Sequence, residues 1–417
     1  MSIINKSNSV LVGLGGAGGS ITDKIISTEP LFDGFFINTS SNDMEVLENY
    51  NKELGNGLIL GTSNGSGTDR NIGKMITHNK GYIVLDRLIN LPQDHIWFIS
   101  SLSGGSGSAI LTTVLGAIKE LKQDGDFDKT IHVISVLPKI KSPKIILENC
   151  KESWNELLQY SDIITSMIFI DNDSKIANNY SILEGEKVIN NNFAEQFISI
   201  FDMATSPQFD NADLSNILND GVLYFYELDE TCSSIDIMLQ KASTFTTLSK
   251  MFKNEMNTDF NSDGEIKTKC GYIGLSLADN SININNILNK FSPSKEVYMG
   301  ENEYEKNILL ISGCLPPFEK IQLINKELED INKNNINNGI DFSQFVIPST
   351  VKEEKFKEFN PNHNEDKPKK RNKNYFPLII TSLPLYCSNS LIESFINSPV
   401  LLSISANIYK LEVFLFD

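Results

Sequence analysis

The sequence predicts an α/β fold: a doubly wound parallel sheet, a long central helix, and then a smaller α+β domain. Three observations predict it. Short apolar runs alternate with stretches of helical periodicity in the first half of the chain, glycine-rich turns follow several of these runs, and residues 184–204 have the periodicity of one long helix. Strands that alternate with helices form parallel sheets, and ligands bind beyond the carboxyl ends of their strands.

The expected elements of the first half follow one another as strand and helix. Residues 9–12 form a short apolar run that ends in a glycine turn, and Ile21, Ile25 and Ile26 give the next helix an apolar face. The same alternation continues to residue 170. Strands are expected at 9–12, 35–37, 58–60, 96–99, 131–136 and 163–170, and helices at 20–26, near 72–75, at 109–121 and at 145–158.

The second half has a different pattern, without a glycine loop of the phosphate-binding type. Strands are expected at 271–277, 296–299 and 308–312, and an amphipathic helix at 316–331. We therefore expect a first domain over 1–205, which includes the long helix, and an α+β domain over 206–335. A polar, basic linker over 336–375 and an apolar tail over 376–417 follow, and the sequence assigns no role to the tail.

Composition excludes several classes of function. The 417 residues carry a net charge of −17, which argues against a nucleic-acid-binding body because phosphate contacts need clustered Lys and Arg. Five scattered cysteines and four isolated histidines predict free thiols in a reducing cytoplasm and no metal cluster. The N-terminus lacks the apolar core of a signal peptide, and no run of ~18 apolar residues occurs, so no membrane insertion is expected.

Three glycine-rich turns stand where an apolar run gives way to a helix. They occupy residues 13–19, 64–69 and 103–109, and the third reads Ser-Gly-Gly-Ser-Gly-Ser-Ala. Glycine lets the backbone approach an anion closely, and a helix N-terminus adds unpaired N–H groups and a positive dipole end. The turns therefore predict a site for phosphate groups.

In their order along the chain, these turns resemble the tubulin/FtsZ family of GTP-dependent filament proteins, and within it the TubZ-like plasmid and phage branch. Residues 13–20 are similar to the first glycine loop of FtsZ, Asn38-Thr39 to the Asn-Thr after its second strand, and 103–109 to the family signature. The resemblance covers roughly residues 9–330 and implies a GTPase domain that binds GTP or GDP with Mg²⁺. The implied phosphate-site residues are Gly15, Gly16, Ala17, Gly18, Asn38, Gly65, Gly67, Thr68, Ser103, Gly104, Gly105, Ser106, Gly107 and Ser108.

Two asparagines are implied as contacts to the guanine base. Asn172 follows an apolar run in Ile-Asp-Asn-Asp, which resembles the family's base-contacting segment, and an amide can pair with part of the guanine edge. Asn192, in the Asn-Asn-Asn run on the long helix, is expected as the second contact. In a chain so rich in Asn, a chance match stays open as the alternative.

Residues 206–216 resemble the loop with which family members act on the nucleotide of the adjacent subunit. FtsZ has Asn-x-Asp-x-x-Asp there, and Asn211 and Asp213 match its first two positions, but Asn216 replaces the second acid. A carboxylate near the terminal phosphate can orient or polarise the attacking water, whereas Asn216 cannot accept a proton. The implied catalytic residues are Asp213, Asp210 and Asn211.

The resemblance implies a filament-forming GTPase that hydrolyses GTP at head-to-tail subunit contacts and serves plasmid or phage DNA partitioning. A structural filament protein that binds GTP with little or no hydrolysis is the alternative. Gly13, Gly15 and Gly18 also fit the dinucleotide pattern GxGxxG, but Asn38-Thr39-Ser40 stands where that fold needs an acid. No GxxxxGK[ST] motif occurs, which excludes a P-loop enzyme.

A basic cluster in the expected linker suggests a second partner besides the protein itself. Five basic residues within seven positions predict a salt-sensitive contact with DNA or with a DNA-bound adaptor. A solvated linker that keeps the tail soluble is the alternative. The cluster consists of Lys367, Lys369, Lys370, Arg371 and Lys373.

Overall fold

The computed structural model describes residues 2–173, 180–204, 208–228, 258–260, 266–278, 285, 288–302 and 307–337. Residues 1–341 form one compact unit. The predictions for the linker beyond residue 337, for the basic cluster at 367–373 and for the tail at 376–417 lie outside the described residues. Within them, no helix is long and apolar enough to cross a membrane.

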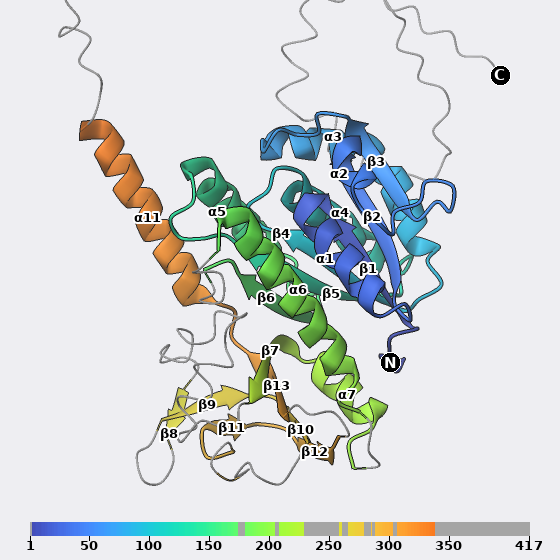
Figure 1. Ribbon diagram of the computed structural model, residues 1–417, viewed down its shortest axis with the longest axis vertical. Coiled ribbons are helices and arrows are strands. Elements are labelled where there is room, and N and C mark those ends of the chain that lie inside the picture. The colour runs from blue at the N-terminus through green and yellow to red at the C-terminus, as the bar shows by residue number, and fades with distance from the viewer. Residues whose placement is uncertain are drawn as a thin grey trace, which may run out of the picture. The chain divides into compact units, whose positions relative to one another are not determined.

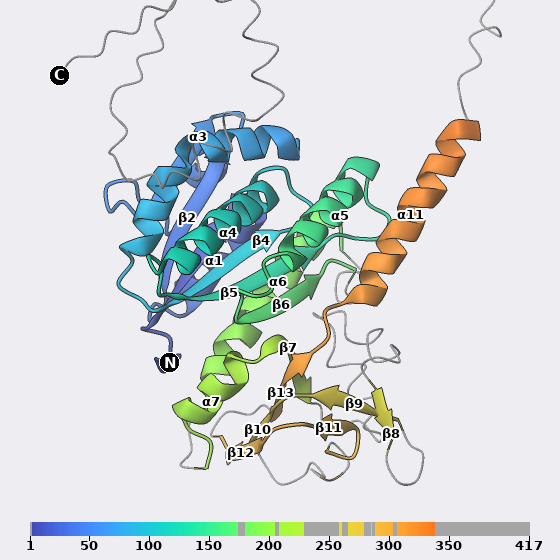
Figure 2. The ribbon, with the colours of Figure 1, turned by 180° about the vertical axis from the view of Figure 1, so that it is seen from behind.

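A ten-stranded sheet runs through the unit in the order β12-β10-β13-β7-β6-β5-β4-β1-β2-β3 (Figures 1 and 2). Neighbours from β3 to β7 are parallel, whereas β13 is antiparallel to β7 and to β10. Strands β11, β9 and β8 form a separate small sheet. The strands are β1 Ser9–Leu14, β2 Asp33–Ser40, β3 Gly57–Thr62, β4 His95–Ser101, β5 Thr130–Leu137, β6 Ser166–Asp171, β7 Gly221–Leu228, β8 Thr258–Phe260, β9 Ile266–Cys270, β10 Ile273–Leu277, β11 Phe291–Pro293, β12 Val297–Glu301 and β13 Asn307–Cys314.

Helices cover both faces of this sheet, which confirms the doubly wound α/β prediction. Side chains of α3, α4, α5 and α11 share one hydrophobic cluster with the sheet, and those of α1, α6 and α7 share the other. The helices are α1 Gly15–Thr28, α2 Ser41–Glu45, α3 Arg70–Ile89, α4 Ser106–Asp124, α5 Lys144–Leu158, α6 Ile182–Phe201, α7 Asn211–Leu218 and α11 Phe318–Asn337. The long helix expected at 184–204 corresponds to α6.

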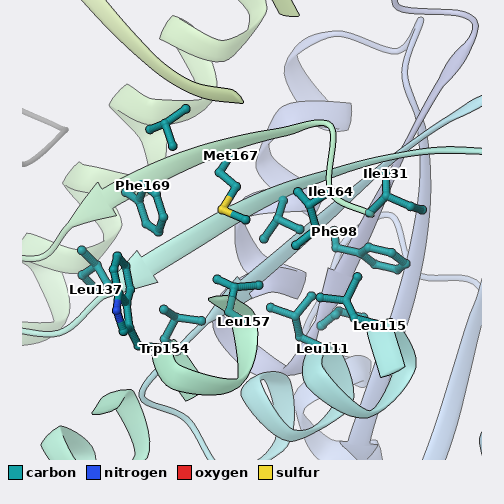
Figure 3. Close-up of a cluster of buried hydrophobic side chains, with 14 of the residues drawn as sticks. Phe98, Leu111, Leu115, Ile131, Leu137, Trp154, Leu157, Ile164, Met167 and Phe169 are labelled. Atoms are coloured by element: carbon teal, nitrogen blue, oxygen red, sulfur yellow. The ribbon is translucent and has the colours of Figure 1, made fainter. Parts of the chain in front are cut away.

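The two clusters follow from the period-two alternation of the strands. In β1, Val10 and Val12 pack toward α4, whereas Leu11 packs toward α1 and α6. Every one of these strand positions is buried because helices cover both faces, so the strands read as continuous apolar runs. Figure 3 shows side chains of β4, β5 and β6, among them Phe98 and Phe169, packed against Leu111 and Trp154 of the helices below.

The strand ends explain where a site can form. Strands β1, β2 and β4 are adjacent and parallel, so the turns that follow them meet at one edge of the sheet. The expected domain boundary near residue 205 falls in a gap of the described residues, and strands on both sides of it belong to the same sheet.

Candidate functional site

A cavity of about 610 Å³ lies at the carboxyl ends of these strands. The three glycine-rich turns meet there, since residues 14–17, 63–68 and 103–107 all line it. The volume is in the range of small-molecule and cofactor sites. The remaining lining residues are Ser40, Asn42, Asp43, Ser101, Val136, Asn172, Glu186 and Asn190.

Two helix N-termini open into this cavity. Helix α1 begins at Gly15 and helix α4 at Ser106. Gly15 has a φ of +69°, and a Cβ on it would lie 2.6 Å from the backbone N of Gly107, so the two turns touch backbone to backbone. The unpaired N–H groups and positive dipole ends of two helices thus converge on one volume, which is a strong arrangement for binding an anion.

The glycines of these turns divide into two kinds. A Cβ on Gly18 would lie 1.9 Å from the carbonyl oxygen of Ile99, and one on Gly105 would lie 2.5 Å from the backbone of Thr68, so both are needed for packing. A Cβ on Gly104 would meet no protein atom within 4 Å, although Gly104 lines the cavity. Gly104 is therefore the position at which an added side chain would enter the cavity without disturbing the fold.

Side-chain hydrogen bonds hold the three turns in register. The hydroxyl of Ser106 is 2.6 Å from that of Thr39 and 2.9 Å from that of Ser66, which joins β2, the 63–68 turn and α4. The amide of Asn149 on α5 donates to the carbonyl oxygens of Thr68 and Ser103, at 2.9 and 3.2 Å. These hydrogen bonds within the protein connect the three turns that form the cavity wall.

Arg70, the first residue of α3, anchors the 63–68 turn from behind. Only 3% of its surface is exposed, and its guanidinium donates to Ser108 and Thr112 of α4 and to Glu156 of α5. Burial raises the pKa of the Glu156 carboxyl, but hydrogen bonds from Arg70 and Lys74 outweigh this and bring the pKa down to about 2. The Glu156 carboxyl is therefore ionised at neutral pH.

One carboxylate, Asp43, lines the end of the cavity that the glycine-rich turns form. The buried Asn38 holds it: Oδ1 of Asn38 accepts from the backbone N of Ser40, and Nδ2 donates to Asp43 at 3.4 Å. Mg²⁺ in nucleotide sites is commonly bound by one or two carboxylates together with phosphate oxygens and water. Among the described residues no cluster of three potential metal ligands occurs, so an ion here would need the phosphates as ligands.

The other end of the cavity is lined by Asn172, which follows β6. Its backbone N donates to Leu137 at 3.1 Å, and Lys320 of α11 pairs with both neighbours, with Asp171 at 2.7 Å and with Asp173. Lys320 is 2% exposed, and burial raises the pKa of Asp171 while Lys320 opposes that rise. The segment that carries Asn172 is thus clamped between the sheet and α11.

Helix α6 contributes Glu186 and Asn190 to the same end. They are four residues apart and share a face of the helix, whereas Asn192 is about 200° further round and does not line the cavity. The periodicity of the helix is the signal that distinguishes Asn190 from Asn192 within the Asn run.

The residues implied as catalytic lie outside the cavity, on α7. Figure 1 shows α7 next to the C-terminal end of α6. The 20 residues of α6 make it about 30 Å long. Asp210 caps α7 by accepting from the backbone N of Ala212 and of Asp213, and Asp213 Oδ2 accepts in return from Asp210 N at 3.1 Å. This is a capping box that sequence analysis did not identify. The side chain of Asn211 is exposed.

The structure therefore brings together most of the residues that the resemblance implied for the nucleotide site. The exceptions are Gly18, Asn38 and Ser108, which lie behind the lining, and Asn192. Residues that sequence analysis did not single out are Asp43, Ser66, Arg70, Asn149, Glu186 and Lys320.

Residues 8–180 match the tubulin/FtsZ family, GTPase domain, in agreement with the resemblance. The tubulin-like protein TubZ of the Clostridium botulinum C phage is 23% identical over 339 residues, 78% of this chain and 84% of TubZ.

Solved structures agree on the fold. The crystal structure of Clostridium botulinum phage c-st TubZ matches with a TM-score of 0.64 and 21% identity, over 79% of this chain and 99% of that one. A GTPγS-form protofilament of Bacillus thuringiensis serovar israelensis TubZ matches with a TM-score of 0.63 and 14% identity, over 80% of this chain and 93% of that one. CetZ from Methanosaeta thermophila matches with a TM-score of 0.58 and 19% identity, over 79% of this chain and 93% of that one.

Proposed function

We propose that this protein binds GTP with Mg²⁺ in the cavity, assembles head to tail into filaments and hydrolyses GTP at the subunit contacts. The convergence of the α1 and α4 N-termini carries the proposal, because it provides for the phosphates of a nucleotide what the family requires. Asp43 would share Mg²⁺ with the phosphates. Asn172 and Asn190 would contact the base.

The distance between the cavity and α7 supports hydrolysis between subunits rather than within one. Asp213 is at the far end of α6 from Glu186 and Asn190, so it would reach a nucleotide only in a neighbouring copy. A contact between unlike surfaces does not close on itself and propagates as a fibre. TubZ of Bacillus thuringiensis serovar israelensis forms protofilaments in its GTPγS form.

The binding site is tested at Gly104. Replacing Gly104 by Val places methyl groups where the phosphates would lie, with no protein atom within 4 Å of the new Cβ. We expect GTP affinity to fall at least tenfold while the unfolding transition stays unchanged. Gly81→Ala is the control, since a Cβ there also meets nothing within 4 Å and Gly81 lies outside the cavity. Unchanged GTP binding in Gly104→Val would refute the assignment.

The filament is tested by pelleting and electron microscopy with GTP, GDP and a slowly hydrolysed analogue. Asp213→Asn should assemble, release phosphate more slowly and yield longer-lived polymer. A nucleotide-bound chain that stays monomeric at high concentration would contradict the shared site. If the wild type assembles without releasing phosphate, the structural filament protein is the correct alternative.

We further propose that the filaments act in plasmid or phage DNA partitioning, through the basic cluster at 367–373. The relationship to phage TubZ supports this role. Neutralising Lys369, Lys370 and Arg371 should abolish DNA maintenance and binding to DNA or its adaptor while polymerisation persists. Retained maintenance would place the coupling elsewhere.

A further inference from the structure

The position at which Asn216 replaces an acid is structured in an unexpected way. The side-chain Nδ2 of Asn216 on α7 donates to the hydroxyl of Tyr298 at 3.1 Å, and that hydroxyl donates to Glu296 at 2.7 Å. The three residues form one chain of hydrogen bonds from α7 to β12 and the segment before it.

The direction of this chain follows from the chemistry of its members. Tyr298 uses its single hydroxyl proton to donate a hydrogen bond to Glu296, because a carboxylate oxygen accepts. The hydroxyl oxygen must then accept from Asn216, which forces the amide to present its NH₂ group inward. Its carbonyl oxygen, Oδ1, consequently faces away from Tyr298, and no partner for it occurs among the described residues. The orientation of the amide is thereby determined.

The ring of Tyr298 is held in place as firmly as its hydroxyl. It stacks with two other rings. The ring centroids are 6.1 Å apart and the planes 24° apart for Phe209, and 5.8 Å and 19° for Tyr272. Phe209 is fully buried, so the stack is anchored in the core. Burial also raises the pKa of Tyr298 to about 12, so the hydroxyl keeps its proton at every pH at which the protein would be assayed.

We infer that Asn216 is a catalytic residue that orients the attacking water through its Oδ1, and that Tyr298 and Glu296 are the positioning residues that aim it. This inference rests on the proposed hydrolysis at subunit contacts. An amide can serve in this way, as the water-positioning Gln of other GTPases does, without accepting a proton. In the reaction the water oxygen bonds to the terminal phosphorus of GTP as the bond from that phosphorus to the β-phosphate oxygen breaks, which leaves GDP. The water's proton passes to the released phosphate or to Asp213.

Tyr298→Phe removes the hydroxyl and keeps the ring in its stack. We expect phosphate release per polymerised subunit to fall about tenfold, since the amide loses its fixed orientation. GTP affinity and the critical concentration for assembly should stay within about twofold of wild type, which a loss of structure would not allow. Tyr272→Phe is the matched control, since it changes another ring of the same stack outside the hydrogen-bond chain and should leave release unchanged.

Asn216→Asp separates this inference from the idea of a missing acid. A carboxylate at 216 would compete with Glu296 for one hydroxyl proton, so release should stay at or below the wild-type rate. Glu296→Gln lets the Tyr298 hydroxyl turn toward Asn216 and reverse the amide, so release should fall there too.

Two results would overturn the inference: faster release in Asn216→Asp, or wild-type release in Tyr298→Phe. Either would leave the proposed GTPase intact. A wild-type protein that assembles without releasing phosphate would refute the proposed hydrolysis itself, and the inference with it.

Discussion

Replacing Arg70 by Met tests whether this residue holds the glycine-rich turns of the cavity in place. The substitution keeps most of the side-chain volume but removes the guanidinium, which is 3% exposed and bonded to Ser108, Thr112 and Glu156. Glu156 would keep Lys74 as its main partner, at 2.5 Å. Removing one member of a buried ion pair is costly because the other member is left in a poorly hydrated place.

The size of the effect follows from the Glu156 carboxyl. Its pKa falls from an ordinary value of 4.5 to about 2, mainly because hydrogen bonds from Arg70 and Lys74 overcome the cost of burial. That shift corresponds to about 3 kcal/mol of stability, of which Arg70 supplies the larger part. Since the folded-state pKa is the lower one, the stabilisation is present above pH 4.5 and is lost as the pH falls toward 2. Roughly half of it should be gone at pH 3.

Urea unfolding at pH 7 and pH 3 measures this directly. At pH 7 we expect Arg70→Met to lower the free energy of unfolding by about 2–3 kcal/mol and Tm by roughly 3–4 °C, and to weaken GTP binding severalfold. The control is Lys119→Met on α4, which breaks the more exposed pair with Asp162 and should change little. A negligible loss of unfolding free energy in Arg70→Met, or an equal loss at both pH values, would refute the reasoning.

Two further perturbations probe other buried polar groups. Lys320→Met should destabilise the fold by about 3 kcal/mol, because it leaves Asp171 and Asp173 without their cationic partner, and should reduce the preference for GTP over ATP. Lys333→Met, at an exposed position on the same helix, is the control. An unchanged nucleotide preference in Lys320→Met would count against a role of this ion pair in holding Asn172. Burial and the neighbouring His95 hold the pKa of His132 well below its usual range, so stability present above pH 6.5 is lost as the pH falls. His132→Gln should therefore reduce the loss of unfolding free energy between pH 7 and pH 5 by up to about 2 kcal/mol, and an unchanged pH dependence in chemical denaturation would argue against a neutral buried imidazole.

The sequence could predict the cavity because its signals are local. A glycine turn between an apolar run and a helix defines a strand end and a helix N-terminus within about ten residues, and parallel strands bring such ends together. The roles of individual glycines were not predictable in this way. Gly18 packs against Ile99, about eighty residues further along the chain, and nothing near Gly18 indicates that contact.

The supporting residues escaped prediction for the same reason. In the sequence, Arg70 and Lys320 look like ordinary surface residues near the start of a helix. Their partners come from distant segments, since Arg70 contacts Glu156 of α5 and Lys320 contacts Asp171 of β6. Strand β7 and the cavity residue Asn190 could both have been predicted from the sequence. The apolar run of β7 is a clear strand signal, and the helical period separates Asn190 from Asn192. The contacts of α7 with a second copy stay a prediction, since one chain contains only half of that interface.

The acids of α7 show how one motif can serve the fold and a reaction together. Asp213 uses Oδ2 to accept from Asp210 N, which closes the capping box, while no hydrogen bond to its Oδ1 occurs among the described residues. The bond that starts the helix therefore also fixes the carboxylate through Oδ2 alone. Alanine at 213 would remove both the carboxylate and a cap worth about 1 kcal/mol. Asparagine keeps an acceptor for Asp210 N and removes only the charge, so the difference between the two variants separates what the residue does for α7 from what it does for a neighbouring nucleotide.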